Sequence, residues 1–153
     1  MLVDENLKKL NVEIPKAPDP VGAYLAYKKI ANLLYISGQI SIDANGKITK
    51  GKLGKDLSIE QGQAAAKLCA LNIIAQAKKA CNERLEKIKN CIKLTGYVNS
   101  TGDFTDQPKV INAASELISA VFDENGKHAR AAISANALPL GAAVEIDAIF
   151  EIK

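Results

Sequence analysis

The last quarter of the chain places three ionisable residues among small and apolar neighbours. Arg130 is flanked by alanines, and Glu145 and Asp147 alternate with valine, isoleucine and alanine. An arginine in such surroundings is costly to desolvate unless an anion faces it. Two interpretations follow. Either Glu145 or Asp147 neutralises Arg130 in a structural ion pair, or Arg130 is a clamp for an anionic ligand, since a guanidinium binds a carboxylate through two parallel hydrogen bonds. The residue types alone favour neither interpretation.

Alternation of side chains predicts the elements that carry these residues. The segment from His128 to Glu151 is predicted to be a hairpin of two strands, joined by a turn at residues 138–141. A period of two buries one face of a sheet. The buried face is expected to carry Ala129, Ala131, Ile133, Ala135, Val144, Ile146, Ala148 and Phe150. Arg130 and Glu145 are then predicted to share the opposite face.

Capping and periodicity predict the remaining elements. Ser58 and Gln61 form a capping-box pattern that opens a helix running to about Ala80. Pro108 suits the first turn of a second helix of roughly fifteen residues. The other predicted elements are an amphipathic helix over 1–12 with Leu2, Leu7 and Leu10 on one side, an extended arm with Pro15, Pro18 and Pro20, a hairpin of 23–30 with 33–42, and a strand around 92–98. Gly38 interrupts the second strand, which indicates a bulge or a close backbone approach.

This order predicts an α+β fold, a single-domain two-layer mixed β-sheet with two helices on one face and ferredoxin-like packing. The other face of the sheet then has no cover within the chain. It is expected to offer Ser37, Thr95, Tyr97, Arg130, Ala132, Ser134, Glu145 and Ile149. A face of small and mixed side chains is better explained by subunit contact than by water. We therefore expect a homo-oligomer with its site at a subunit boundary.

Composition excludes several classes of protein. Within 153 residues the net charge is only +3, tryptophan is absent, and no apolar run is long enough to span a membrane. Nucleic acid and membrane partners are therefore not expected. The N-terminus does not resemble a secretory signal, and three irregularly spaced cysteines are typical of reduced thiols, so a cytoplasmic location is predicted.

The sequence offers few metal ligands or nucleophiles. His128 is the only histidine, and no pair of cysteines has two-residue spacing, so no metal site is expected. His128 precedes Arg130 by two residues and is interpreted as a rim residue rather than a catalytic base. The cysteines are interpreted as small buried hydrophobes, because no paired base is evident.

Motifs from residue 21 onward resemble the Rid (YjgF) family of reactive-intermediate imine/enamine deaminases. The matching segments, in family order and spacing, are Val21-Gly-Ala-Tyr24, Tyr35-Ile-Ser-Gly-Gln-Ile40, Val110-Ile-Asn-Ala113, Ala129-Arg130, Leu138-Pro139 and Val144-Glu-Ile-Asp-Ala148. Residues 1–20 are expected to form an N-terminal helix and arm, and 21–153 the Rid/YjgF-like domain. The longer N-terminus and the details around 106–114 and 138–143 indicate a divergent subgroup.

The resemblance implies a homotrimer of chorismate-mutase-like subunits with three clefts between neighbours. Such proteins hydrolyse 2-imino or enamine acids, of the 2-iminobutanoate/2-iminopropanoate type, to 2-keto acids and ammonia without a cofactor. By position, Arg130 would bind the substrate carboxylate and Glu145 would orient or activate water. Tyr24 would line the cleft, Gly38 would let the backbone approach the ligand, and Asn112 would help to shape the site.

One departure from the family pattern bears on activity. Many active deaminases carry a Ser-Cys pair after the arginine, where this chain has Ala131-Ala132. Water activation would then depend on Glu145 and backbone groups. The alternative function is a non-catalytic trimeric protein that binds small carboxylates or regulates a partner. An endoribonuclease is less favoured, because one histidine cannot supply a histidine acid–base pair.

Overall fold

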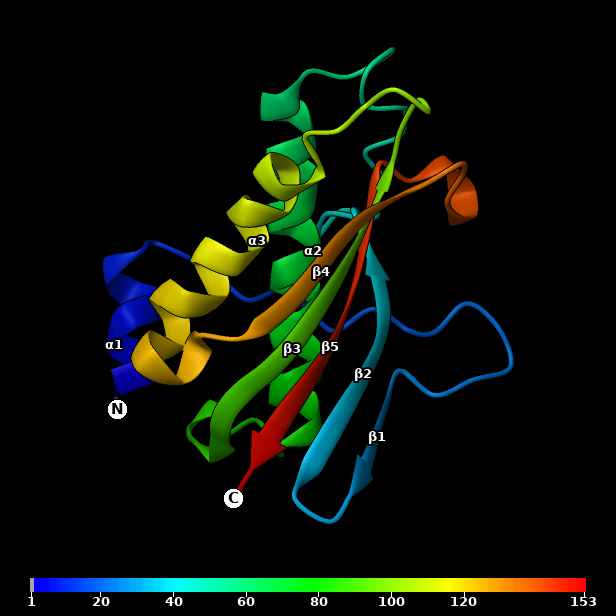
Figure 1. Ribbon diagram of the computed structural model, residues 1–153. Coiled ribbons are helices and arrows are strands. Elements are labelled where there is room, and N and C mark those ends of the chain that lie inside the picture. Colours follow the sequence, from blue (N-terminus) through cyan, green and yellow to red (C-terminus); the bar gives the residue numbers. More distant parts are fainter. Residues whose placement is uncertain (1) are drawn as a thin grey trace.

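Five strands form one mixed sheet in the order β1-β2-β5-β3-β4 (Figure 1). The structure is a computed structural model that describes residues 2–153. The strands are β1 (Tyr27–Ile30), β2 (Leu33–Ile40), β3 (Ile88–Asn99), β4 (Ala129–Ala135) and β5 (Val144–Ile152). β4 runs parallel to β3, and all other neighbours are antiparallel. The predicted hairpin near the N-terminus is confirmed as β1 and β2.

The helices α1 (Leu2–Lys9), α2 (Ile59–Ala80) and α3 (Gln107–Phe122) lie on one side of this sheet (Figure 1). Short 3₁₀ turns occupy 85–87, 123–126 and 139–141. The capping box is confirmed, because the Gln61 amide donates to Ser58 Oγ at 3.1 Å and the Ser58 amide donates to Gln61 Oε1 at 2.8 Å. Pro108 lies in the first turn of α3, as predicted. The two-layer α+β prediction is therefore confirmed, and the predicted N-terminal helix joins the two long helices on the same side.

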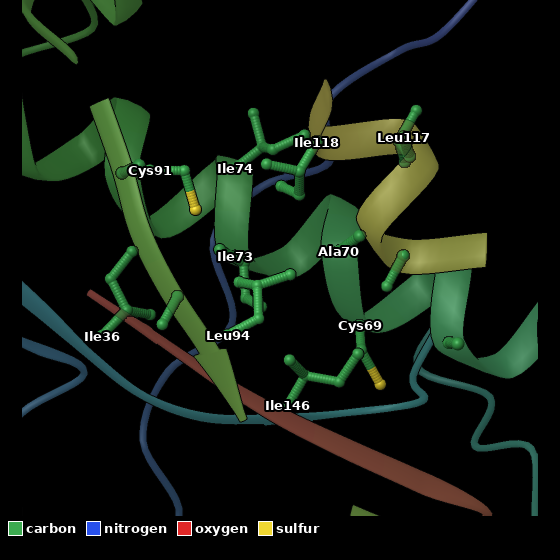
Figure 2. Close-up of a cluster of buried hydrophobic side chains, with 14 of the residues drawn as sticks. Ile36, Cys69, Ala70, Ile73, Ile74, Cys91, Leu94, Leu117, Ile118 and Ile146 are labelled. Carbon is green, nitrogen blue, oxygen red and sulfur yellow. The ribbon is translucent and has the colours of Figure 1, made fainter. Parts of the chain in front are cut away.

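The core lies between the sheet and the two long helices. Figure 2 shows Ile73 and Ile74 of α2 packed with Leu94 of β3 and Ile118 of α3. Gly96 lets α3 approach β3 closely, since a Cβ there would lie 2.6 Å from the Ile111 side chain. This close approach sets α3 against β3 and the edge strand β4.

All three cysteines are free and buried within this core, as predicted. Burial raises the pKa of the Cys91 thiol to about 12, and it raises the pKa of Cys69 and Cys81 as well. Thiols held protonated in this way act as small apolar side chains and are poor nucleophiles.

The predicted C-terminal hairpin is wrong. Both strands exist, but β3 lies between β4 and β5 and pairs with each of them. After α3 the chain returns beside β3 in parallel orientation, and the turn at residues 139–141 then carries it across to a gap between β2 and β3. Strands that follow one another in sequence need not be neighbours when a helix crossover precedes them.

The predicted face of β4 is also wrong. Arg130 is in register with Leu94, and Ser134 with Val98, and both of these β3 residues are completely buried on the helical side. Residues paired across neighbouring strands share a face, so Arg130, Ala132 and Ser134 point to the helical side. Ile133, predicted to be buried, lies on the open face and is 49% exposed. Alanines occupy both sides of this strand, so alternation alone could not identify the buried one.

The N-terminal helix packs through Val3, Asn6 and Leu7, so that of the three predicted leucines only Leu7 contacts the core. Leu2 is 58% and Leu10 40% exposed, whereas Asn6 is buried. Asn6 Nδ2 donates to the Val121 carbonyl at 3.1 Å and to Asp123 Oδ2 at 2.8 Å. Carbonyls in the last turn of a helix lack partners within the helix, so an amide side chain fits against the end of α3 better than leucine does. The division of the chain at residue 20 stays a prediction.

Candidate functional site

Glu145 lies on the open face of the sheet, directly over a β-bulge in β2. The register between β2 and β5 shifts between Ile36 and Gln39, which confirms an irregularity at Gly38. A Cβ on Gly38 would lie 2.8 Å from both Cδ and Oε2 of Glu145. Glycine is therefore needed at this position so that the carboxylate can lie against the backbone.

A cavity of about 340 Å³ adjoins this carboxylate. Its walls come from the N-terminal arm around 18–26, from the bulge at 38–42 and from the turn containing Pro139 and Leu140. Tyr24, predicted to line a cleft, and Gly38, predicted to let the backbone approach a ligand, are brought together with Glu145 here. The arm is held in place by Gln76, whose Nε2 donates to the Pro18 carbonyl at 2.7 Å.

The electrostatic surroundings of Glu145 favour its protonated form. Burial, and secondarily the nearby Asp147 carboxylate, raise the pKa of the half-buried Glu145 above its ordinary value. Burial also raises the pKa of Asp147, although the Tyr97 hydroxyl, which donates to Asp147 Oδ2 at 3.3 Å, lowers it. Within residues 2–153, no hydrogen bond or ion pair reaches the Glu145 carboxylate. A carboxylate of this kind is a stronger base than an exposed one once it is ionised.

Arg130 lies at the opposite edge of the molecule, between β4 and α3. Its Nη1 donates to Asn112 Oδ1 at 2.8 Å and to Ser115 Oγ at 3.2 Å. Both acceptors are neutral, and among the described residues no carboxylate forms a salt bridge with Arg130. Of the two interpretations, the structural ion pair with Glu145 or Asp147 is therefore excluded, because these carboxylates lie on the other face of the sheet with β3 in between.

The predicted site residues thus form two separate groups in one chain. Glu145, Gly38 and Tyr24 meet at the cavity, while Arg130 and Asn112 meet at the outer edge of β4. Ser115 and His128 also belong to the second group, since His128 Nε2 lies 2.9 Å from Ser115 Oγ. The sequence carried one signal for Ser115. It follows Asn112 by three residues, and residues three apart on a helix share a face.

Neither group has the donors of a metal centre. Across residues 2–153, no three His, Cys, Asp or Glu side chains gather closely enough to hold an ion. Of the helices described, none combines the length and the apolar character needed to cross a membrane.

Comparison with known proteins identifies the family. The family model for YjgF/chorismate mutase-like, putative endoribonuclease proteins matches residues 4–151. The chain belongs to this family. The YjgF-like match therefore includes most of α1 and the arm, in addition to the motifs from residue 21 onward, and the resemblance inferred from those motifs is confirmed.

Individual YjgF-like relatives differ in what their names say. Protein TCP17 of Trypanosoma cruzi is 41% identical and covers 99% of this chain and 94% of its own. The crystal structure of Atu1372 from Agrobacterium tumefaciens, a protein with unknown function, has 44% identity and a TM-score of 0.91, covering 99% of this chain and 94% of its own. A 2-iminobutanoate/2-iminopropanoate deaminase of Dermatophagoides farinae is 25% identical and covers 93% of this chain and 95% of its own.

Proposed function

We propose that the protein is a cofactor-free imine/enamine hydrolase that converts 2-imino acids, of the 2-iminobutanoate/2-iminopropanoate type, to 2-keto acids and ammonia. One observation carries the proposal: Arg130 and Glu145 lie on opposite faces of the sheet, and neither forms an ion pair within residues 2–153. Each charge is thus available to a ligand, and a single ligand can meet both only where two copies join. The active assembly is a homotrimer with clefts between neighbouring subunits.

The reaction needs little more than two placed charges and a water molecule. Arg130 of one copy holds the substrate carboxylate through the N–H bonds that Asn112 and Ser115 leave free. Glu145 of the neighbouring copy accepts a proton from water as the oxygen attacks the imine carbon. Glu145 returns this proton to the imine nitrogen, which gives a neutral carbinolamine. Transfer of the hydroxyl proton to the nitrogen as the C–N bond breaks then releases ammonia and leaves the 2-keto acid. Orientation of this kind can account for much of the rate.

The exposed sheet face supports the assembly. Tyr35 of β2, which pairs with Ile149 of β5, is 44% exposed there, and Ile133 of β4 is 49% exposed. Apolar side chains of this size are typical of subunit contacts. Light scattering after size exclusion should give three times the 16.3 kDa chain mass. A monomer at micromolar concentration would contradict both the interface and the shared site. The buried, unpaired cysteines fit a cytoplasmic setting.

Complementation between two inactive variants tests the shared site. Arg130→Ala and Glu145→Gln proteins are each expected to be inactive on imino acids generated by an amino-acid oxidase, followed by timed semicarbazone formation. If the two are unfolded together and refolded as a mixture, clefts that combine an intact Arg130 with an intact Glu145 should form. Random mixing around a closed ring predicts recovery of about a quarter of wild-type activity.

The control is to mix the two variants after each has been refolded alone, which should restore nothing while the trimers stay intact. Full activity in either single variant would contradict the roles assigned to these residues. Absence of recovery in mixtures shown to contain hybrid trimers would contradict a site shared between copies.

A non-catalytic carboxylate-binding trimer is the second candidate, and Ala132 favours it. This residue replaces a family cysteine on the same side of β4 as Arg130. Ala132→Cys should raise deaminase activity or change the substrate preference if the protein is an enzyme. If wild type and Ala132→Cys both leave every imino acid unchanged, the binding function is the better account. Cleavage of RNA by metal-free protein, lost in Arg130→Ala, would instead support a ribonuclease.

A further inference from the structure

Arg130 belongs to a chain of hydrogen bonds that ends at the only histidine of the protein. Arg130 Nη1 lies 3.2 Å from Ser115 Oγ, and that oxygen lies 2.9 Å from His128 Nε2. On the other side of the ring, His128 Nδ1 lies 2.6 Å from the carbonyl oxygen of Gly126. The chain links β4 to α3 and to the 3₁₀ turn at 123–126.

With a neutral His128 ring, the direction of every hydrogen bond in this chain follows from its partners. The Gly126 carbonyl can only accept, so Nδ1 of His128 carries a proton. In the neutral ring Nε2 is then an acceptor, and the Ser115 hydroxyl donates to it. The lone pairs of Ser115 Oγ are left to accept from Arg130. A charged ring would instead aim two cations, His128 and Arg130, at one oxygen atom.

The same contacts decide which edge of the guanidinium is free. Nη1 has two N–H bonds, enough for its two acceptors, Asn112 Oδ1 and Ser115 Oγ. Within the described chain, no acceptor is bonded to Nε or Nη2. These two nitrogens form the edge that presents parallel N–H bonds to a carboxylate. Holding Nη1 against α3 therefore fixes the plane in which a carboxylate would bind.

We propose that Ser115 and His128 are positioning residues for the ligand-binding arginine, with neutral His128 setting the orientation of the Ser115 hydroxyl and Ser115 setting that of Arg130. The inference rests on the proposed function only in taking Arg130 as the group that binds the substrate carboxylate. It replaces the interpretation of His128 as a rim residue. Neither residue touches the substrate, so their effect must pass through the guanidinium.

Binding of 2-oxobutanoate, measured by calorimetry, tests the relay. Ser115→Ala and His128→Phe should each weaken binding about tenfold, the effect of losing one hydrogen bond to a charged group. Ser115→Thr keeps the hydroxyl, and His128→Gln keeps an acceptor near the Nε2 position, so both should restore most of the affinity. The double variant Ser115→Ala/His128→Phe should bind no more weakly than Ser115→Ala alone, because the two residues act in series.

Nitrogen NMR provides a second measurement that does not depend on a ligand. His128 is the only histidine, and Arg84 and Arg130 are the arginines of the chain, so their signals can be assigned by substitution. The ring should be the neutral Nδ1–H form, and His128→Phe should shift the Arg130 guanidinium signals while leaving those of Arg84 unchanged. His128→Gln should largely reverse the shift.

The outcomes separate this inference from the proposed function. The proposed function fails if wild type does not bind 2-oxobutanoate, or if the ligand does not shift the Arg130 signals. The effect of His128→Phe on the Arg130 signals then still tests the relay. If wild type binds but affinity and Arg130 signals are unchanged in Ser115→Ala and His128→Phe, the relay is overturned. An Nε2–H ring would overturn it as well. If His128→Phe and His128→Gln lose affinity equally, and the losses add up in the double variant, Ser115 and His128 have only a general structural role.

Discussion

Glu145, at the cavity beside β2, and Arg130, at the outer edge of β4, both lack an ion-pair partner among the described residues, but their surroundings differ. Glu145 lies on the bulge at Gly38 among mainly apolar walls, and no hydrogen bond within the described chain stabilises its ionised form. Arg130 is surrounded by polar groups, all of them neutral, that orient the guanidinium without cancelling its charge. The comparison shows that one fold leaves a carboxyl group and a guanidinium, at two separate places, without ion-pair partners among the described residues.

The largest effect is expected at the cavity, from Glu145→Gln. This substitution keeps the size of the side chain but removes the proton acceptor. If Glu145 activates the water, deaminase activity should fall about 10²- to 10⁴-fold, with affinity for 2-oxobutanoate changed only slightly. Glu116→Gln on the exposed surface of α3 is the matched control. Activity retained in Glu145→Gln would assign the water to another group.

Arg130→Ala should have the next largest effect, and on binding. Removal of a charged clamp costs about 2–5 kcal/mol of binding free energy, so calorimetry should find affinity for 2-oxobutanoate at least about 30-fold lower. The melting temperature should hardly change, because no ion pair is lost. Arg84→Ala, which removes an exposed arginine, is the control. A large loss of stability with binding retained would mean that Arg130 is structural after all.

A smaller effect is expected from Asn112→Asp, which tests whether a ligand needs the charge of Arg130. Asn112→Asp would place a carboxylate at the atom that now lies 2.8 Å from Arg130 Nη1. The new charge would compete with a ligand carboxylate, and affinity for 2-oxobutanoate should fall about tenfold. The melting temperature should stay the same or rise. Unchanged affinity would indicate that the ligand does not need the charge of Arg130.

The smallest effect concerns stability and pH. An acid whose pKa is raised by folding is protonated in both states at low pH, so it then has no effect on stability. As pH rises past the unfolded value, 4.5 for Glu145 and 3.8 for Asp147, the unfolded chain releases its proton first and stability falls. Glu145→Gln should therefore raise the melting temperature by a few degrees near neutral pH.

The same variant should have no such advantage at about pH 3, below the unfolded pKa of the carboxyl. A melting temperature that is equally raised at both pH values would point to packing instead of ionisation. Glu116→Gln again provides the baseline for loss of one surface charge.

Local signals in the sequence determined most of the elements. The capping box at Ser58 and Gln61 and the proline at the start of α3 were recognisable because caps depend on a few neighbouring residues. The alternation of Val144, Ile146, Ala148 and Phe150 identified the buried face of β5 correctly, since its other face carries charged residues. The motifs around Tyr24, Gly38, Arg130 and Glu145 were enough to identify the family.

Only the tertiary structure decided how the two charges are related. Strand order depends on pairing between distant segments, and nothing local indicated that β5 would enter between β2 and β3. The face of β4 was equally undetermined, because alanines occupy both sides of this strand. It is the register with Leu94 that turns Arg130 toward α3 and away from Glu145. Sequence therefore determined the family and its motif residues, and long-range packing determined that one chain keeps Arg130 and Glu145 apart.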